Sequence, residues 1–284
     1  ITVNAPIDSS GQTNTATLNF SDENTDNNLT VNFNEKIKLG VNQILTGNAT
    51  TVNLNNPLAI IQNGVDVALS GATLNIASGT FYDPTVININ KNLTLTGQGQ
   101  TSTFLNGSNS HQVLNIASGN TVNINNVTIQ NGKGGFGGGI YNRGNLNINN
   151  STIQNNVAGV GAGIDNSGFL TINNSTISNN TATGNGGGII NRATTFINNS
   201  IISNNTTNAG GGGIRSILGH LTITNTTISN NIADTDGGGI NNGSGTLTIN
   251  NSIISGNVAN GLDKTGNYEG GGGIYNDIGT FTIT

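Results

Sequence analysis

Polar and apolar residues alternate along the chain in short runs that return at regular intervals. Residues 145–149, NLNIN, alternate asparagine with leucine or isoleucine, which is the period-2 pattern of a strand with one buried face. A polar Asn-Asn-Ser corner follows, a second apolar run surrounds Ile153, and Asn155-Asn156 forms another corner. No helical period occurs anywhere, so the pattern predicts an all-β chain.

The same pattern returns every 24 to 26 residues between residue 121 and the end of the chain. Each unit carries a GGGI-type segment whose isoleucine begins a third predicted strand, and these isoleucines are Ile140, Ile164, Ile189, Ile214, Ile240 and Ile274. A repeat of this length is typical of solenoids, in which one unit cannot bury its apolar face alone and must stack on its neighbours.

We therefore predict a right-handed single-stranded parallel β-helix with three strands and three corners per coil. Stacked coils about 4.8 Å apart would align like residues, so we expect Ile148, Ile172 and Ile197 to form one internal file. Asparagine tolerates left-handed corner conformations and can bond to its equivalent on the next coil. The glycines permit positive φ and close backbone approach.

The regularity of the pattern divides the chain into three parts. Residues 1–40 are predicted to be a capping or entry segment, because an open β-helix end is an exposed sheet edge. Residues 41–120 are expected to form irregular coils, and residues 121–284 the regular ones. Since the last unit breaks off within a repeat, we expect a segment of a longer protein.

Composition excludes several classes of function. Only 7% of the residues are charged, the net charge is −5, and the 8 basic residues are scattered, whereas nucleic-acid binding requires clustered Lys and Arg. No apolar run of about 18 residues predicts a transmembrane helix. Cysteine is absent, so thiol chemistry is excluded and cysteine usage does not indicate a compartment.

The repeats carry two motifs, GGGI (Gly137–Ile140, Gly186–Ile189) and IxxN (Ile153 to Asn156, Ile177 to Asn180). In this they resemble the right-handed β-helices of the pectin-lyase-like superfamily, and most of all the repeats of bacterial polymorphic outer-membrane proteins and autotransporter passengers. Isoleucine stands where that family has phenylalanine in FxxN. The resemblance implies a secreted or surface-displayed protein, such as an adhesin of the cell outer membrane, although the same fold also hosts enzymes.

The strand after each GGGI is expected to display the richest outward chemistry. Asp165 should lie between Arg143 and Arg192, one coil away on either side, and carbohydrate contacts are predicted for this surface at Tyr141, Arg143, Asp165, Arg192, Arg215 and Tyr275. An ordinary surface ion network is the first interpretation of these charges, ahead of ligand contact and of catalysis. If the chain is an enzyme, Arg143, Asp165 and Arg192 are the candidate catalytic residues.

Other candidate sites are weaker. Asp234 and Asp236 resemble the start of a calcium loop, which Asp263 and Glu269 could complete, but an ordinary turn is the favoured explanation. Lys264 and Tyr268 lie in an insertion at 261–269, where surface contacts are common in repeat proteins. His111 and His220 lie several coils apart and are expected to be surface or corner residues. No cofactor is expected apart from this calcium alternative.

These observations favour a non-enzymatic extracellular or cell-surface rod that contacts carbohydrate or protein, with self-association as a further expectation and nucleic acid excluded. The alternative is a polysaccharide lyase or epimerase. A remote alternative is ice binding by a flat predicted face that contains Thr176, Ile201, Thr227 and Ile253.

Overall fold

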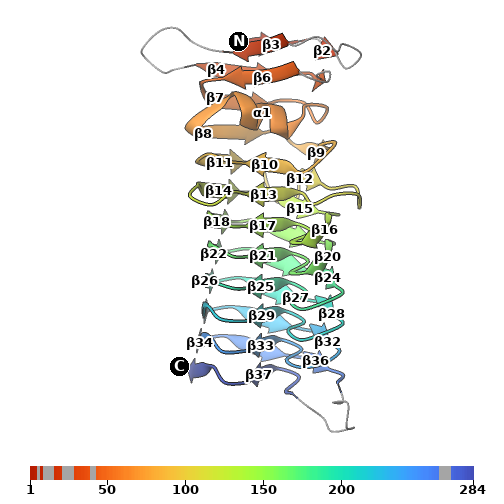
Figure 1. Ribbon diagram of the computed structural model, residues 1–284, viewed down its shortest axis with the longest axis vertical. Helices are drawn as coiled ribbons and strands as arrows, with labels where there is room; N and C mark the ends of the chain where they lie inside the picture. Colours follow the sequence, from red (N-terminus) through yellow and green to blue (C-terminus); the bar gives the residue numbers. More distant parts are fainter. Residues whose placement is uncertain (5–6, 9–15, 21–28, 39–42, 262–269) are drawn as a thin grey trace.

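The computed structural model describes residues 1–4, 7–8, 16–20, 29–38, 43–261 and 270–284. The described strands stack along one axis into a rod, with the N-terminus at one end and the C-terminus at the other (Figure 1). All their pairings are parallel, and the chain is a parallel β-solenoid as predicted.

Four sheets run along the rod. The long sheet contains, in order, β1 (Thr2–Val3), β4 (Thr30–Phe33), β7 (Ala49–Leu54), β8 (Ala68–Ile76), β11 (Leu93–Thr96), β14 (Thr121–Asn125), β18 (Asn145–Asn149), β22 (Phe169–Asn173), β26 (Thr194–Asn198), β30 (His220–Thr224), β34 (Thr246–Asn250) and β38 (Thr280–Ile283). It is on the left in Figure 1.

The Thr/Ser sheet follows the long sheet within each coil. Its strands are β9 (Gly79–Phe81), β12 (Thr103–Asn106), β15 (Thr128–Gln130), β19 (Thr152–Gln154), β23 (Thr176–Ser178), β27 (Ile201–Ser203), β31 (Thr227–Ser229) and β35 (Ile253–Ser255). The GGGI sheet closes each coil with β10 (Ile87–Ile89), β13 (Leu114–Ile116), β17 (Ile140–Asn142), β21 (Ile164–Asn166), β25 (Ile189–Asn191), β29 (Ile214–Ser216), β33 (Ile240–Asn242) and β37 (Ile274–Asn276).

The fourth sheet departs from the expected three strands per coil. This short sheet lies between the Thr/Ser and GGGI sheets and contains β16 (Lys133–Phe136), β20 (Val157–Val160), β24 (Thr181–Ala182), β28 (Thr206–Thr207), β32 (Ile232–Ala233) and β36 (Val258–Ala259). The prediction of three strands was wrong because most of these strands are too short to show alternation. They form because each pairs with its equivalent on the next coil.

The internal file predicted from the repeat is confirmed. Ile148 pairs with Ile172, which pairs with Ile197, and all three side chains are fully buried. The isoleucines that follow the GGG segments pair in the same way from Ile140 to Ile274. Their burial along the axis supplies the apolar core that a single coil lacks.

The first third of the chain also contributes strands to the stack. β1 and β4 belong to the long sheet, and two further parallel pairs form between β2 (Ile7–Asp8) and β5 (Ile37–Lys38) and between β3 (Ala16–Phe20) and β6 (Gln43–Gly47). One helix, α1 (Ile61–Val67), follows β7 and contradicts the expectation that no helix occurs. Tertiary contacts explain it, since Ile61, Val65 and Val67 are buried.

Asparagines turn the corners as expected. Asn150, Asn155, Asn174 and Asn179 all have φ between 47° and 56°, a left-handed conformation that asparagine tolerates better than most residues. Gly256 takes the place of asparagine at the equivalent corner of a later coil, with φ of 62°. The corner sequence therefore reflects backbone geometry.

Candidate functional site

The candidate site after the GGGI segments forms one outer column. Tyr141, Asp165, Ile190, Arg215, Asn241 and Tyr275 follow one another in register along the GGGI sheet. This column is less accessible than expected, because Asp165, Ile190 and Asn241 are buried. The first glycine of the GAGI segment approaches this column: a Cβ added to Gly161 would lie only 2.6 Å from Ile190 Cγ2 and 3.0 Å from the Asp165 Cα. Only glycine permits this approach.

Asp165 is held by a single arginine. Arg192 Nε lies 3.3 Å from Asp165 Oδ1, and Arg192 Nη2 lies 3.5 Å from Oδ2, in a fork-to-fork arrangement. The aspartate side chain has no exposed surface, whereas that of Arg192 is 35% exposed. Burial raises the pKa of Asp165, and the hydrogen bond and charge of Arg192 oppose that rise. Both carboxylate oxygens are thus engaged.

Arg143 does not complete the expected Arg–Asp–Arg network. Its guanidinium carbon lies 5.2 Å from the centre of the Tyr141 ring, and Nη2 donates a hydrogen bond to Asn115 Oδ1 at 3.3 Å. Tyr141 also stacks on Phe136, with ring centres 6.0 Å apart. Arg143 therefore belongs to an exposed aromatic and amide group toward the N-terminal side, separate from the Asp165–Arg192 pair.

A second polar group surrounds Arg215. Its guanidinium donates to Asn241 Oδ1, and burial lowers the pKa of Arg215 while the charges of Asp236 and Asp277 oppose that change. The pKa of Asp236 is raised by burial and by the charge of Asp277, and lowered by Arg215. Tyr275 also acts electrostatically on Arg215. Ile190 lies on the strand between Asp165 and Arg215, so it separates this group from Asp165.

The calcium candidates are only partly within the described residues. Asp234 and Asp236 lie near the corner before β33, and Asp236 interacts electrostatically with Arg215. Asp263, Lys264, Tyr268 and Glu269 fall outside the described residues. Among the described residues, no group of three or more His, Cys, Asp or Glu side chains could hold a metal ion.

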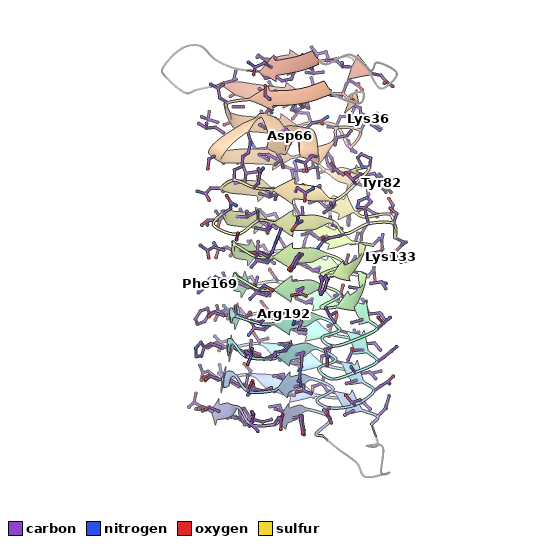
Figure 2. The ribbon with its side chains drawn as sticks, viewed as in Figure 1. Lys36, Asp66, Tyr82, Lys133, Phe169 and Arg192 are labelled. Atoms are coloured by element: carbon purple, nitrogen blue, oxygen red, sulfur yellow. The ribbon has the colours of Figure 1, made fainter. Side chains whose placement is uncertain are left out.

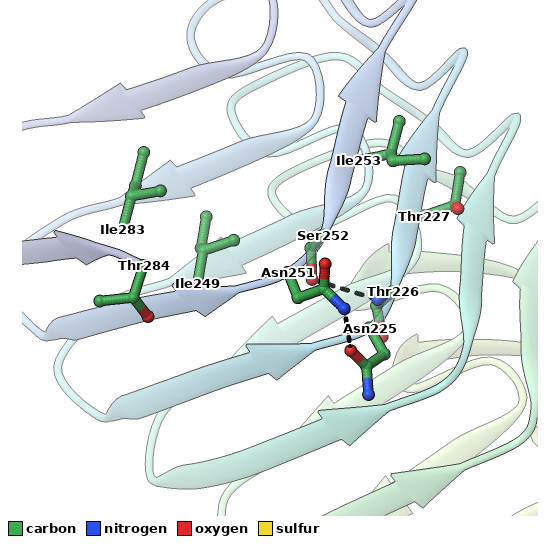
Figure 3. A pocket seen from close by; sticks show the side chains of 9 residues that line it. All are labelled: Asn225, Thr226, Thr227, Ile249, Asn251, Ser252, Ile253, Ile283 and Thr284. Carbon is green, nitrogen blue, oxygen red and sulfur yellow. Dashed lines mark hydrogen bonds between the residues drawn. The ribbon is translucent and has the colours of Figure 1, made fainter.

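A pocket of about 500 Å³ (Figure 3) lies at the corner between the long sheet and the Thr/Ser sheet, near the C-terminal end of the rod. Asn225, Asn251 and Ser252 line it together with Thr226, Thr227, Ile249, Ile253, Ile283 and Thr284. Asn251 Nδ2 donates to Asn225 Oδ1 at 2.6 Å, and Thr226 N–H donates to Ser252 Oγ at 3.1 Å. No side chain that ionises near neutral pH lines the pocket, so it offers no acid–base group.

The structure reveals a buried carboxylate that sequence reasoning missed. Asp83, which follows β9, accepts hydrogen bonds from the N–H groups of Ile61 at 3.1 Å and Gln62 at 2.9 Å, at the start of α1. His111 Nε2 lies 3.0 Å from the Asp83 carbonyl oxygen. Burial raises the pKa of the Asp83 carboxyl to about 6, against these hydrogen bonds and the charge of His111. The side chain caps a helix that no sequence period indicated.

An aromatic pair on the long sheet was missed as well. The rings of Phe169 and Phe196 have centres 5.5 Å apart, and Phe169 is exposed. The signal was present in the sequence: Phe196 occupies a position that holds asparagine or threonine in the neighbouring repeats. The flat face predicted on the Thr/Ser sheet is in register, with Thr176, Ile201, Thr227 and Ile253 in successive strands.

Comparison with protein-family models, with curated proteins and with solved structures gives no match for this chain. No helix among the described residues combines the length and apolar character needed to cross a membrane. Function is therefore inferred from the geometry of the lateral faces.

Proposed function

We propose that this protein is a non-enzymatic extracellular or cell-surface rod that presents its lateral faces to carbohydrate or protein. The observation that carries the proposal is the unbroken parallel pairing of the long sheet from β1 to β38, which keeps a constant register from β8 onward. It repeats outward side chains at about 4.8 Å intervals along the molecule, and extended faces of this kind are what solenoids commonly use for binding. The GGGI and IxxN motifs support a relationship to pectin-lyase-like surface β-helices.

The alternative of a polysaccharide lyase or epimerase is less well supported. A general base must reach the proton that it removes, but the Asp165 side chain is enclosed and both its oxygens face Arg192. Asp236 belongs to the separate Arg215 group. We infer that Asp165 and Arg192 stabilise the stack, and that the lateral faces act by contact.

Beads coated with the protein test this proposal against its alternative. We expect them to retain bacterial cells or purified cell-surface material, and to release no unsaturated sugar products from acidic polysaccharides. Products that accumulate with wild-type protein and disappear with Asp165→Asn would establish the enzyme instead. Beads that carry folded protein and retain nothing would also overturn the proposal.

A further inference from the structure

In one coil of the long sheet, a polar residue takes one inward position and an apolar residue takes the outward position next to it. Thr195 points into the core in register with Leu170 and Leu221, while Phe196 points outward in register with Thr171 and Thr222. The buried Thr195 hydroxyl needs hydrogen-bond partners in the core. It donates to Asn191 Oδ1 at 2.8 Å and accepts from Asn166 Nδ2 at 3.0 Å. Local violations of patterning with compensation elsewhere are expected at functional positions.

The outward ring makes a platform with a second aromatic residue. Phe169 pairs with Thr194 and Phe196 with Thr171, so the two phenylalanines are diagonal neighbours, within reach of one another across adjacent strands. Their ring planes are inclined by 42°, and Phe169 is 41% exposed. Figure 2 shows Phe169 at the outer edge of the long sheet, away from Arg192, which follows β25.

Ordered amides lie beside this platform. Asn173 donates to Asn149 Oδ1 at 2.9 Å, and Asn198 donates to Asn173 Oδ1 at 3.0 Å. An amide has two N–H donors and two acceptor lone pairs, so Asn173 keeps one donor and one acceptor position after making both ladder bonds. The ladder already fixes the asparagine side chains. These side chains would therefore lose little conformational entropy when a ligand binds to them.

The outward positions of the long sheet around the platform contain no Asp, Glu, Lys or Arg in the described strands β14 to β34. From β14 to β34 the outward positions of the long sheet hold Asn, Thr and Phe, with His220 the one titratable side chain among these described strands. An acidic or basic ligand would find no counter-ion there. A pyranose ring suits this surface, since its C–H face can pack on an aromatic ring while its hydroxyls bond to amides.

We propose that the long sheet binds a neutral polysaccharide, with Phe169 and Phe196 as the stacking platform and Asn149, Asn173 and Asn198 as hydrogen-bonding partners. The inference deepens the proposed function, because it names the face and the class of ligand. It does not involve the outer column of the GGGI sheet.

The test is affinity electrophoresis of the whole chain in gels that contain amylose, dextran, a soluble β-glucan or polygalacturonate. The variants are Phe169→Thr and Phe196→Thr, which introduce the residue found in register on a neighbouring coil. Ile201→Thr is the matched control, because Ile201 is exposed on the Thr/Ser sheet and its neighbours in register are Thr176 and Thr227. Circular dichroism checks that every variant remains folded.

We expect at least one neutral polysaccharide to retard the wild type and the control equally, at low and high salt. Each phenylalanine variant should bind about tenfold more weakly, as expected for loss of a central aromatic anchor. Equal retardation of wild type and phenylalanine variants, or retardation by polygalacturonate alone, would overturn the inference, as would no retardation by any neutral polysaccharide. If the gels give one of these negative results while the wild type still retains cells on beads, this inference fails and the proposed function stands.

Discussion

The side-chain oxygen of Asn205 accepts two hydrogen bonds from Asn180, one from its backbone N–H at 3.0 Å and one from its side-chain amide at 2.9 Å. The same Asn180 amide also donates to the carbonyl oxygen of Ile153 at 3.0 Å. Both asparagines are fully buried. Each side chain in this ladder thus satisfies backbone groups on adjacent coils that stacking alone leaves unpaired.

Asn205→Ala should lower the free energy of unfolding by about 2–3 kcal/mol, because it leaves buried donors on Asn180 without an acceptor. Urea denaturation measures the change. Asn208→Ala is the control, since Asn208 lies in the same coil with an exposed side chain, and it should alter stability by less than about 0.5 kcal/mol. Equal effects of the two substitutions would contradict the role assigned to the ladder.

The corner at Asn179, where φ is 56°, should accept glycine but not a β-branched residue. Asn179→Gly is expected to change stability by less than about 1 kcal/mol, whereas Asn179→Val should cost about 2 kcal/mol because its Cβ crowds the left-handed backbone. Thermal unfolding of both variants provides the comparison. A valine variant as stable as the glycine variant would mean that the corner relaxes to another conformation.

Removal of Arg192 should show how much an unpaired, buried Asp165 carboxylate lowers the free energy of unfolding. We expect Arg192→Ala to lose about 2 kcal/mol at neutral pH, less than for a fully buried pair because the arginine is partly exposed. The pKa of Asp165 should rise further, so acidification should recover part of the loss.

Two further variants test that interpretation. The double variant Arg192→Ala/Asp165→Asn should be more stable than Arg192→Ala, since no unpaired charge remains. Arg143→Ala removes the same side chain from an exposed site and should cost less than about 0.5 kcal/mol. Loss of stability in the double variant equal to that in Arg192→Ala would show that packing, and not charge, governs the site.

Asp83 gives the chain a specific pH dependence. Its pKa is about 6 in the folded state against 3.8 in the reference state, so the folded state binds the proton more tightly. This contribution to the free energy of unfolding is therefore fully present below about pH 4 and is lost as pH rises to about 6, by up to about 3 kcal/mol.

Asp83→Asn removes that titration while the side-chain shape is kept. The stability of wild type minus that of the variant should fall as pH rises from about 4 to 6, in urea denaturation at each pH. If this difference rises over the same range, the hydrogen bonds from Ile61 and Gln62 outweigh desolvation, and the pKa of Asp83 is depressed.

The alternation of Leu146 and Ile148 with asparagine, repeated at near-constant spacing, was enough to predict the solenoid and its internal file. Every coil must bury the same few positions, and a slip by one residue would turn them to solvent, so register follows from the pattern. The corner asparagines could be predicted for the same reason, because left-handed backbone restricts residue choice locally.

The tertiary structure alone decided which outward residues meet and which are covered. Gly161 approaches the backbone of Asp165 closely, and of the two expected arginines only Arg192 pairs with its carboxylate. Phe169 and Phe196 lie far apart in sequence but touch diagonally across adjacent strands. α1 forms where the carboxylate of Asp83, 22 residues after Ile61, accepts its first N–H groups. The repeat predicts that equivalent residues stack along one axis. Contacts between different residues depend on their distances in the folded chain, which the repeat does not determine.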